Sequence, residues 1–157
     1  MKHEFATPIL LRYFCFFWFF LFFGSTAAFA DEIDYAHAII TTSAGNEIPV
    51  EVADTVEKRS LGLVNRPGLK KGWGMLFVFE KRKLHRFWMK KMQFSLDIIW
   101  LDNNKIVHIL RSIQPAISGE EPQTMSPPVP ANFVLEIDAG RASELKLQLG
   151  HRVQYQF

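Results

Sequence analysis

The feature of this sequence that most limits its fold is a series of short apolar runs separated by turn residues. Residues 74–79 (GMLFVF) and 133–137 (FVLEI) are almost wholly apolar, and residues 94–101 alternate between two sets of side chains. Runs of this length between turn signals are typical of β-strands. They mostly follow one another without regular helical crossovers. We therefore expect a mainly β fold, a small antiparallel β-sandwich or barrel with two short helices.

Further strands are predicted on both sides of this central part. Residues 36–53 have the pattern of a hairpin, with Pro49 better suited to an edge strand than to a central one. Short strands are expected over residues 87–92, 105–111 and 152–157. Because these segments are linked mainly by turns, antiparallel pairing is expected throughout.

Two helices and two loops complete the predicted architecture. Asp54 opens a capping-box pattern and is the expected N-cap of a helix that ends near Leu63. A second short helix is expected between about residues 140 and 147. Residues 81–86 are predicted to form an exposed basic loop. Residues 114–130 contain five prolines and are predicted to form a loop of unusual length.

The first 30 residues have the order of a secretory signal. Basic residues precede an apolar run at residues 13–23, and the small-x-small sequence Ala28-Phe29-Ala30 follows. As a helix this run would extend only about 16 Å, well short of a hydrocarbon core of ~30 Å. Export to the bacterial periplasm, or secretion, with cleavage near Ala30 is therefore expected, and an uncleaved anchor is the alternative. Cys15 is the single cysteine of the chain, so the exported part would contain no thiol or disulfide.

Charge is distributed unevenly along the chain. Residues 58–91 contain 11 lysines and arginines and one acidic residue, Glu80, although the whole chain has a formal net charge of only +2. Lys and Arg side chains beside aromatic residues favour an anionic partner such as anionic lipid headgroups, an acidic glycan or an envelope protein. Nucleic acid is not an expected partner of an exported protein. Alternatively, these cations are solvated or pair with acidic residues elsewhere in the fold. The candidate surface for an anionic partner consists of Lys81, Arg82, Lys83 and Arg86.

Two acidic residues interrupt predicted strands. Asp97 lies between Leu96 and Ile98, and Glu136 faces the same side of its strand as Val134. A carboxylate in such a position is usually paired or part of a site, because burying it alone is costly. If the two faced each other across a cleft, they would have the composition of a glycosidase pair. A structural ion pair of Asp97 with Arg66 or Lys90 is the alternative. The candidate ligand-binding residues are Arg66, Trp88, Lys90, Asp97 and Glu136.

Motifs that would identify a reaction are absent from the sequence. It contains no GxSxG elbow, no glycine-rich phosphate loop and no dinucleotide fingerprint. The histidines at 37, 85, 108 and 151 do not have metal-ligand spacing. We therefore assign no catalytic residue, and we expect no metal and no cofactor.

Several motifs in order resemble one known family. They include Gly62-Leu63, GMLFVF at 74–79, FWMK at 87–90, LDII at 96–99 and VLE at 134–136. Over residues 45–156 the chain is similar to the uncharacterised domain-of-unknown-function family 192. The resemblance implies a small β fold of jelly-roll kind and brings no activity with it. The chain departs from the family pattern where Val64, Lys91-Met92 and Ser95 replace a Met, an Asn-Thr pair and a Pro.

Two functions from different classes are consistent with these observations. The favoured one is a non-catalytic envelope module that binds an anionic ligand or an envelope partner. The alternative is a small-ligand-binding or hydrolytic enzyme whose cleft contains Asp97 and Glu136. The two hypotheses differ in whether these carboxylates converge on an open pocket.

Overall fold

The computed structural model describes residues 33–117, 119 and 121–157, which form one compact unit from Ile33 to Phe157. The expected export signal and its cleavage site lie outside the described residues. Among the described residues, no helix has the length and apolar character needed to cross a membrane. The elements are β1 (Ala36–Thr42), β2 (Glu47–Ala53), α1 (Val56–Leu61), β3 (Gly74–Lys83), β4 (Phe87–Trp88), β5 (Leu96–Asp102), β6 (Lys105–Ile113), β7 (Thr124–Met125), β8 (Ala131–Asp138), α2 (Arg141–Glu144) and β9 (Val153–Gln156).

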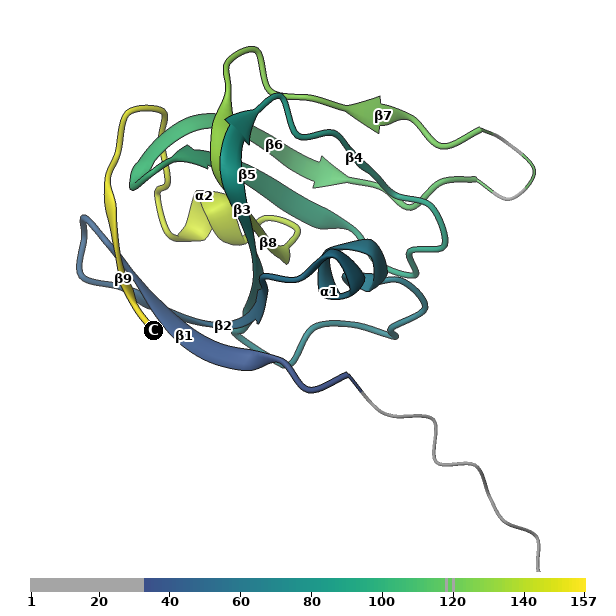
Figure 1. The fold of residues 1–157 in the computed structure, drawn as a ribbon, viewed down its shortest axis with the longest axis horizontal. Coiled ribbons are helices and arrows are strands. Elements are labelled where there is room, and N and C mark those ends of the chain that lie inside the picture. Colours follow the sequence, from purple (N-terminus) through teal and green to yellow (C-terminus); the bar gives the residue numbers. More distant parts are fainter. Residues whose placement is uncertain (1–32, 118, 120) are drawn as a thin grey trace, which may run out of the picture. The chain divides into compact units, whose positions relative to one another are not determined.

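The main sheet has seven strands in the order β6-β5-β8-β3-β2-β1-β9, and it curls into a half-barrel (Figure 1). Its two edge strands meet at one end. There the Ile106 N–H donates to the His151 carbonyl at 2.9 Å, and the Val153 N–H donates to the Asn104 carbonyl at 2.9 Å. A second sheet contains only β4 and β7. The mainly β fold with two short helices, predicted from the sequence, is confirmed.

One strand pair differs from the antiparallel expectation. β2 and β3 are parallel, with Val50 opposite Gly74, and α1 and the segment after it connect them. A parallel pair needs a long connection of this kind. β2 is also not an edge strand, although it contains Pro49. Pairing with β3 begins at Val50, so the residue that lacks an N–H lies one position before that ladder.

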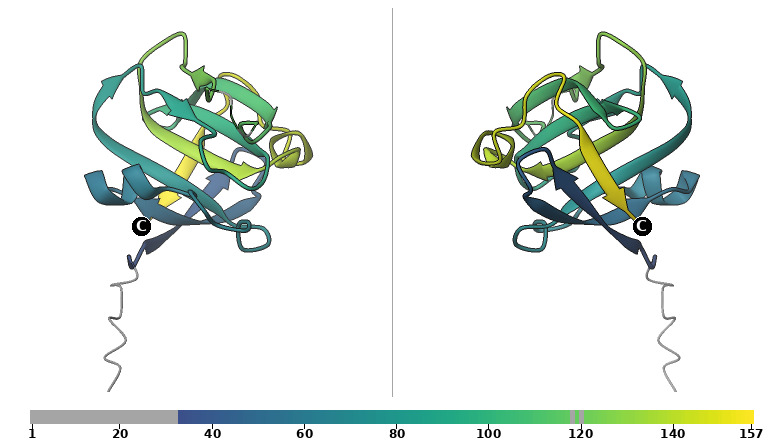
Figure 2. Two further views of the ribbon diagram at one scale, coloured as in Figure 1. Left: turned by 90° about the vertical axis from the view of Figure 1, so that its right-hand side faces the viewer. Right: turned by 90° about the vertical axis from the view of Figure 1, so that its left-hand side faces the viewer.

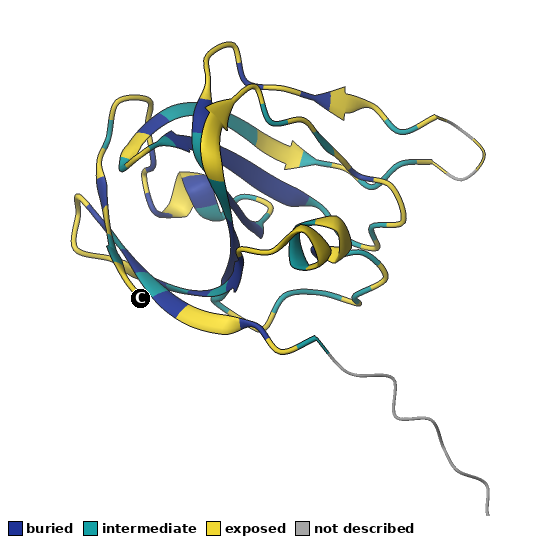
Figure 3. Ribbon diagram, viewed as in Figure 1, coloured by how far each residue is buried: buried dark blue, intermediate teal, exposed yellow. Residues whose placement is uncertain are grey.

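The core consists of two clusters, one on each face of the central strands. On β5, Ile99 and Leu101 belong to the cluster inside the curl, where Ala142 of α2 joins them. Ile98 and Trp100 belong to the cluster on the outer face. The central strands are therefore buried on both faces, as Figure 3 shows for β5. This explains why β5 is apolar at almost every position.

The outer cluster is covered by segments outside the main sheet. Leu63 follows α1, Met89 follows β4, and Met125 ends β7, and all three are buried on this face. α1 lies on the outside of the curl (Figure 2) and has no buried residue of its own. The outer face thus has a thin cover rather than a second full layer.

Several predicted element boundaries were wrong. Thr55, not Asp54, is the N-cap of α1, because its hydroxyl oxygen accepts the Lys58 N–H at 3.2 Å. β3 extends to Lys83, so residues 81–83 belong to a strand and not to a loop. The predicted strand 87–92 is reduced to β4, whose partner β7 lies within the segment 114–130.

Candidate functional site

The two strand carboxylates lie on opposite faces of the main sheet. In the antiparallel pair of β5 and β8, Asp97 is opposite Ile137 and Ile98 is opposite Glu136. Since successive side chains alternate between faces, Asp97 shares the inner face with Ile137, and Glu136 shares the outer face with Ile98. The structure therefore does not bring Asp97 and Glu136 together in one cleft.

The Asp97 carboxylate supports the fold by accepting backbone hydrogen bonds. It is fully buried, and its two oxygens accept the Ser112 N–H at 2.7 Å and the Ala142 N–H at 2.8 Å. These bonds fasten the end of β6 and the first turn of α2 to β5. The alternative interpretation, an ion pair with Arg66 or Lys90, is not observed, because the Asp97 oxygens accept hydrogen bonds from backbone N–H groups instead.

Arg66 and Lys90 do not join Glu136 either. The Arg66 guanidinium pairs with Glu51 at 2.5 Å and lies over the Tyr35 ring at 5.0 Å. Lys90 is exposed in the turn after β4. In this turn Lys91 has a φ of 57°. That left-handed conformation suits asparagine better than lysine, which gives a physical meaning to the Lys91-Met92 departure noted in the sequence.

A pocket of about 460 Å³ lies on the outer face, where α1 and β4 are on the same side of β3 (Figure 1). Its lining combines aromatic, aliphatic and charged side chains from α1, β3, β4, β8 and the segments between them. Two of the predicted ligand-binding residues, Trp88 and Glu136, belong to it. The residues that line it are Val56, Arg59, Ser60, Leu61, Gly62, Leu63, Val64, Phe77, Phe79, His85, Arg86, Phe87, Trp88, Met92 and Glu136.

Glu136 is the most unusual group in this lining. The residue is 6% exposed, and no described residue forms an ion pair or side-chain hydrogen bond with its carboxyl group, whose oxygens keep some contact with the pocket's solvent. Burial raises the pKa of Glu136 to about 8, because the charged form loses its hydration and gains no partner. At neutral pH the group is therefore mainly protonated, and it can donate a hydrogen bond.

Aromatic rings form much of the wall. The Phe77 and Phe87 rings meet edge to face with centroids 5.0 Å apart, and the His85 ring stacks on Phe79 at 3.6 Å. Edge-to-face and stacked contacts of this kind hold the rings in fixed orientations.

The entrance to the pocket is apolar as well as exposed. Val56 is 66% exposed, Leu61 is 40% exposed and Trp88 is 61% exposed, and all three line the pocket. Large apolar side chains that gather at one opening mark a binding site more strongly than the same residues scattered over a surface.

Cations accompany these apolar groups. One Arg59 nitrogen donates to the main-chain oxygens of Asp54 at 2.6 Å and Val78 at 2.8 Å, and its guanidinium lies over the Phe79 ring at 5.2 Å. Arg86 is exposed at the lining. No carboxylate within the described ranges forms a salt bridge with either arginine. With Glu136 protonated, the lining is positively charged.

Two other cations of the basic stretch form ion pairs. Arg82 pairs with Asp102 at 2.5 Å, and Lys58 pairs with Asp54 at 3.5 Å. Lys81 and Lys83 are exposed on β3. Of the four predicted surface residues, Arg86 alone lines the pocket, and Arg82 shows the pairing with acidic residues that was the alternative interpretation.

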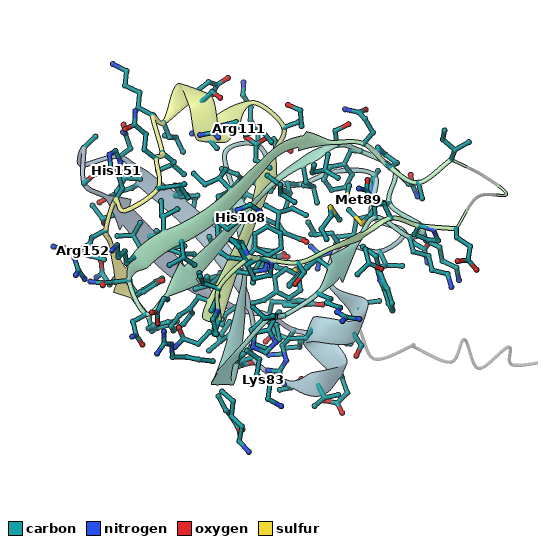
Figure 4. All side chains as sticks on the ribbon, turned by 90° about the horizontal axis from the view of Figure 1, so that it is seen from above. Lys83, Met89, His108, Arg111, His151 and Arg152 are labelled. Atoms are coloured by element: carbon teal, nitrogen blue, oxygen red, sulfur yellow. The ribbon has the colours of Figure 1, made fainter. Side chains whose placement is uncertain are left out.

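Metal-binding side chains are dispersed in the described part of the chain. His108 on β6 and His151 before β9 lie apart (Figure 4). No group of three or more His, Cys, Asp or Glu side chains in residues 33–117, 119 and 121–157 is placed to hold a metal ion.

Most of the pocket was not predicted from the sequence. Arg59, Phe77, Phe79 and His85 carry no motif that would identify them as site residues. The sequence did offer one signal, the apolar residues Val56 and Leu61 at the two ends of a short predicted helix. In the structure both side chains are exposed, and α1 has no buried residue.

The fold and this pocket define a small, half-barrel β domain with a candidate ligand site on its outer face. The chain belongs to the family DUF192, described as an uncharacterized ACR, whose model matches residues 39–155. The resemblance seen in the motifs is thereby confirmed.

Two solved bacterial structures share the fold. One is a protein from Sinorhizobium meliloti 1021 described as a "putative transcription regulator", with 26% identity and a TM-score of 0.70, covering 79% of this chain and 97% of that one. The other is a protein of unknown function from Novosphingobium aromaticivorans DSM 12444, with 24% identity and a TM-score of 0.68, covering 80% and 88%. No curated protein sequence matches the chain significantly.

Proposed function

We propose that this domain is an exported, non-catalytic binding module that holds a small anionic ligand in the pocket between α1 and β4. The observation that carries the proposal is Glu136, a buried carboxyl group without a partner among the described residues, on the lining of an aromatic pocket. A volume of about 460 Å³ lies within the range of small-molecule sites. A carboxyl group largely withdrawn from water gains from a hydrogen-bond partner, so a ligand that supplies one is stabilised there.

Binding is preferred to hydrolysis because of the position of Asp97. Glycoside hydrolysis needs two carboxyl groups on either side of one bond. Asp97 lies on the other face of the sheet, and two backbone N–H groups occupy its oxygens. The pocket lining contains one carboxyl group, Glu136, so we do not propose a hydrolytic pair.

The charge of the lining supports an anion as the ligand. Arg59 and Arg86 contribute two positive charges, and burial keeps Glu136 mainly neutral at pH 7. A positive, partly desolvated site attracts anions and disfavours amines. An acidic sugar and a lipid headgroup are the envelope sources of this chemistry. Under this proposal the domain leaves the cytoplasm and would not meet chromosomal DNA, so the regulator description of the Sinorhizobium protein is not extended to it.

The pocket is tested by blocking it. Ser60 is exposed on α1 and lines the pocket, whereas Ser143 is exposed on α2 on the other side of the fold. The probe is 1-anilinonaphthalene-8-sulfonate, an aromatic anion that fluoresces on entering an apolar site. Wild type and Ser143→Trp should enhance its fluorescence at low salt, and Ser60→Trp should not. Equal enhancement by both variants, or none by wild type, would refute the pocket as the site.

Export is tested separately. Residues 1–30 fused to alkaline phosphatase, which is active only outside the cytoplasm, should give activity, and removal of residues 13–23 should abolish it. N-terminal sequencing of the exported full chain should begin near Asp31. A start at Met1 with activity retained would instead support the uncleaved anchor.

A further inference from the structure

We infer that Glu136 donates a hydrogen bond to an uncharged oxygen of the ligand, while the ligand's anionic group lies at the mouth of the pocket near Arg86. The inference rests on the proposed function and names the ligand class: small organic acids with a carbonyl or similar acceptor at the end opposite the acid. Three features of the pocket support it.

The first feature is the separation of charge within the lining. Glu136 is buried, whereas Arg86 is exposed at the lining. No salt bridge joins Glu136 to an arginine among the described residues, so the arginines do not lie against its carboxyl group. A ligand anion beside the arginines would therefore not be the group that contacts Glu136.

The second feature is the character of Glu136 itself. A protonated carboxyl group has one O–H donor, and in this pocket no described side chain accepts from it. A buried carboxylate facing a ligand carboxylate would place two charges in an apolar site, which is unfavourable. An uncharged acceptor satisfies the O–H without that cost.

The third feature is the wall between the two ends. Phe77, Phe79 and Phe87 line the pocket, and Trp88 with Val56 and Leu61 forms its exposed rim. Such a wall accepts a flat or apolar body that connects the acceptor to the acid.

The test uses three matched probes and measures binding by calorimetry at low salt. The probe 4-acetylbenzoate has both the carbonyl acceptor and the anion. In 4-isopropylbenzoate the acceptor is replaced by a group of the same shape, and in 4-acetylbenzamide the anion is removed. At pH 6 we expect 4-acetylbenzoate to bind about tenfold more tightly than 4-isopropylbenzoate, the difference made by one buried hydrogen bond. The benzamide should bind several-fold more weakly than the benzoate, and added salt should reduce that difference.

The pH profile separates a donor role of Glu136 from a merely structural one. Neither the acetyl group nor the benzoate titrates between pH 6 and 9, so affinity for 4-acetylbenzoate should fall as Glu136 ionises. Glu136→Gln supplies an amide N–H donor and should keep the affinity while removing this fall. Glu136→Leu should abolish the preference for acetyl over isopropyl. His85→Gln, which removes the imidazole from the same pocket lining, should keep the fall.

The possible outcomes distinguish this inference from the proposed function. Equal binding of 4-isopropylbenzoate and 4-acetylbenzoate, or a pH profile that Glu136→Gln leaves unchanged, overturns the inference. If Ser60→Trp still abolishes binding in that case, the pocket remains the site. If none of the three probes binds but Ser60→Trp removes the fluorescence of the sulfonate probe, the inference is overturned and the proposed function stands. Failure of the sulfonate test overturns the proposed function as well.

Discussion

The clearest consequence of the structure is that Glu136 should make the protein less stable as the pH rises. Its pKa is raised by burial from 4.5 to about 8, so between these values the folded state binds more protons than the unfolded state. Under this condition the free energy of unfolding falls with increasing pH. The destabilisation begins near pH 4.5 and is complete above about pH 8.

The size of the effect follows from the same pKa difference. One pKa unit corresponds to about 1.4 kcal/mol, so the change from 4.5 to about 8 corresponds to roughly 5 kcal/mol of lost stability. Glu136→Gln has nearly the same shape but no titrating proton. The difference in unfolding free energy between wild type and Glu136→Gln should therefore change by roughly 5 kcal/mol between pH 4.5 and 9, to the disadvantage of wild type.

The assay is urea unfolding, followed by tryptophan fluorescence, at half-unit steps from pH 4.5 to 9. Titrations of other groups are common to both proteins and cancel in the difference. Glu80→Gln changes an exposed glutamate on β3 and serves as the matched control, with a flat difference expected. A wild-type minus Glu136→Gln difference that varies by less than about 1 kcal/mol over this range would refute the assignment of Glu136 as a buried, unpartnered carboxyl group.

Three further substitutions test the surrounding structure by the same urea unfolding measurement. Asp97→Ala should cost roughly 2–5 kcal/mol because it leaves the buried Ala142 N–H and the partly buried Ser112 N–H without their acceptor, and a loss below about 1 kcal/mol would contradict that role. Lys91→Asn should stabilise by about 1 kcal/mol because the position has a φ of 57°, and no gain would show that the lysine is not strained there. Gly74→Ala should destabilise by about 1–3 kcal/mol, since the new methyl group would lie 2.7 Å from the main-chain oxygen of Glu136 and 2.8 Å from Ile137, whereas wild-type stability would mean that the sheet yields at little cost.

The strands were predictable because their signal is local. Alternating or continuous apolar runs determine which residues are extended, and β5 and β8 lie close to the predicted segments. The first helix was predicted one residue from its true N-cap, because both Asp54 and Thr55 are suitable capping residues and only the backbone geometry distinguishes them. β7 was missed, since a two-residue strand among prolines depends on its partner β4 for its existence.

The pocket could not be predicted in the same way. Its lining comes from α1, β3, β4 and β8, which are separated in sequence and meet only on the outer face of the folded sheet. The parallel pairing of β2 with β3 was missed for a related reason. The connection through α1 does not have the regular length and periodicity that usually indicate a parallel crossover.

The sequence by itself determined that the chain is mainly β, that it belongs with one family, and which residues interrupt its strands. It also determined that Asp97 lies on the same face of its strand as Ile99, and Glu136 on the same face of its strand as Val134, because side chains alternate along each strand. Only the tertiary structure decided that these two faces are opposite. That depends on the register of β5 against β8, where Asp97 is opposite Ile137, and a shift of one residue would have placed the two carboxyl groups side by side.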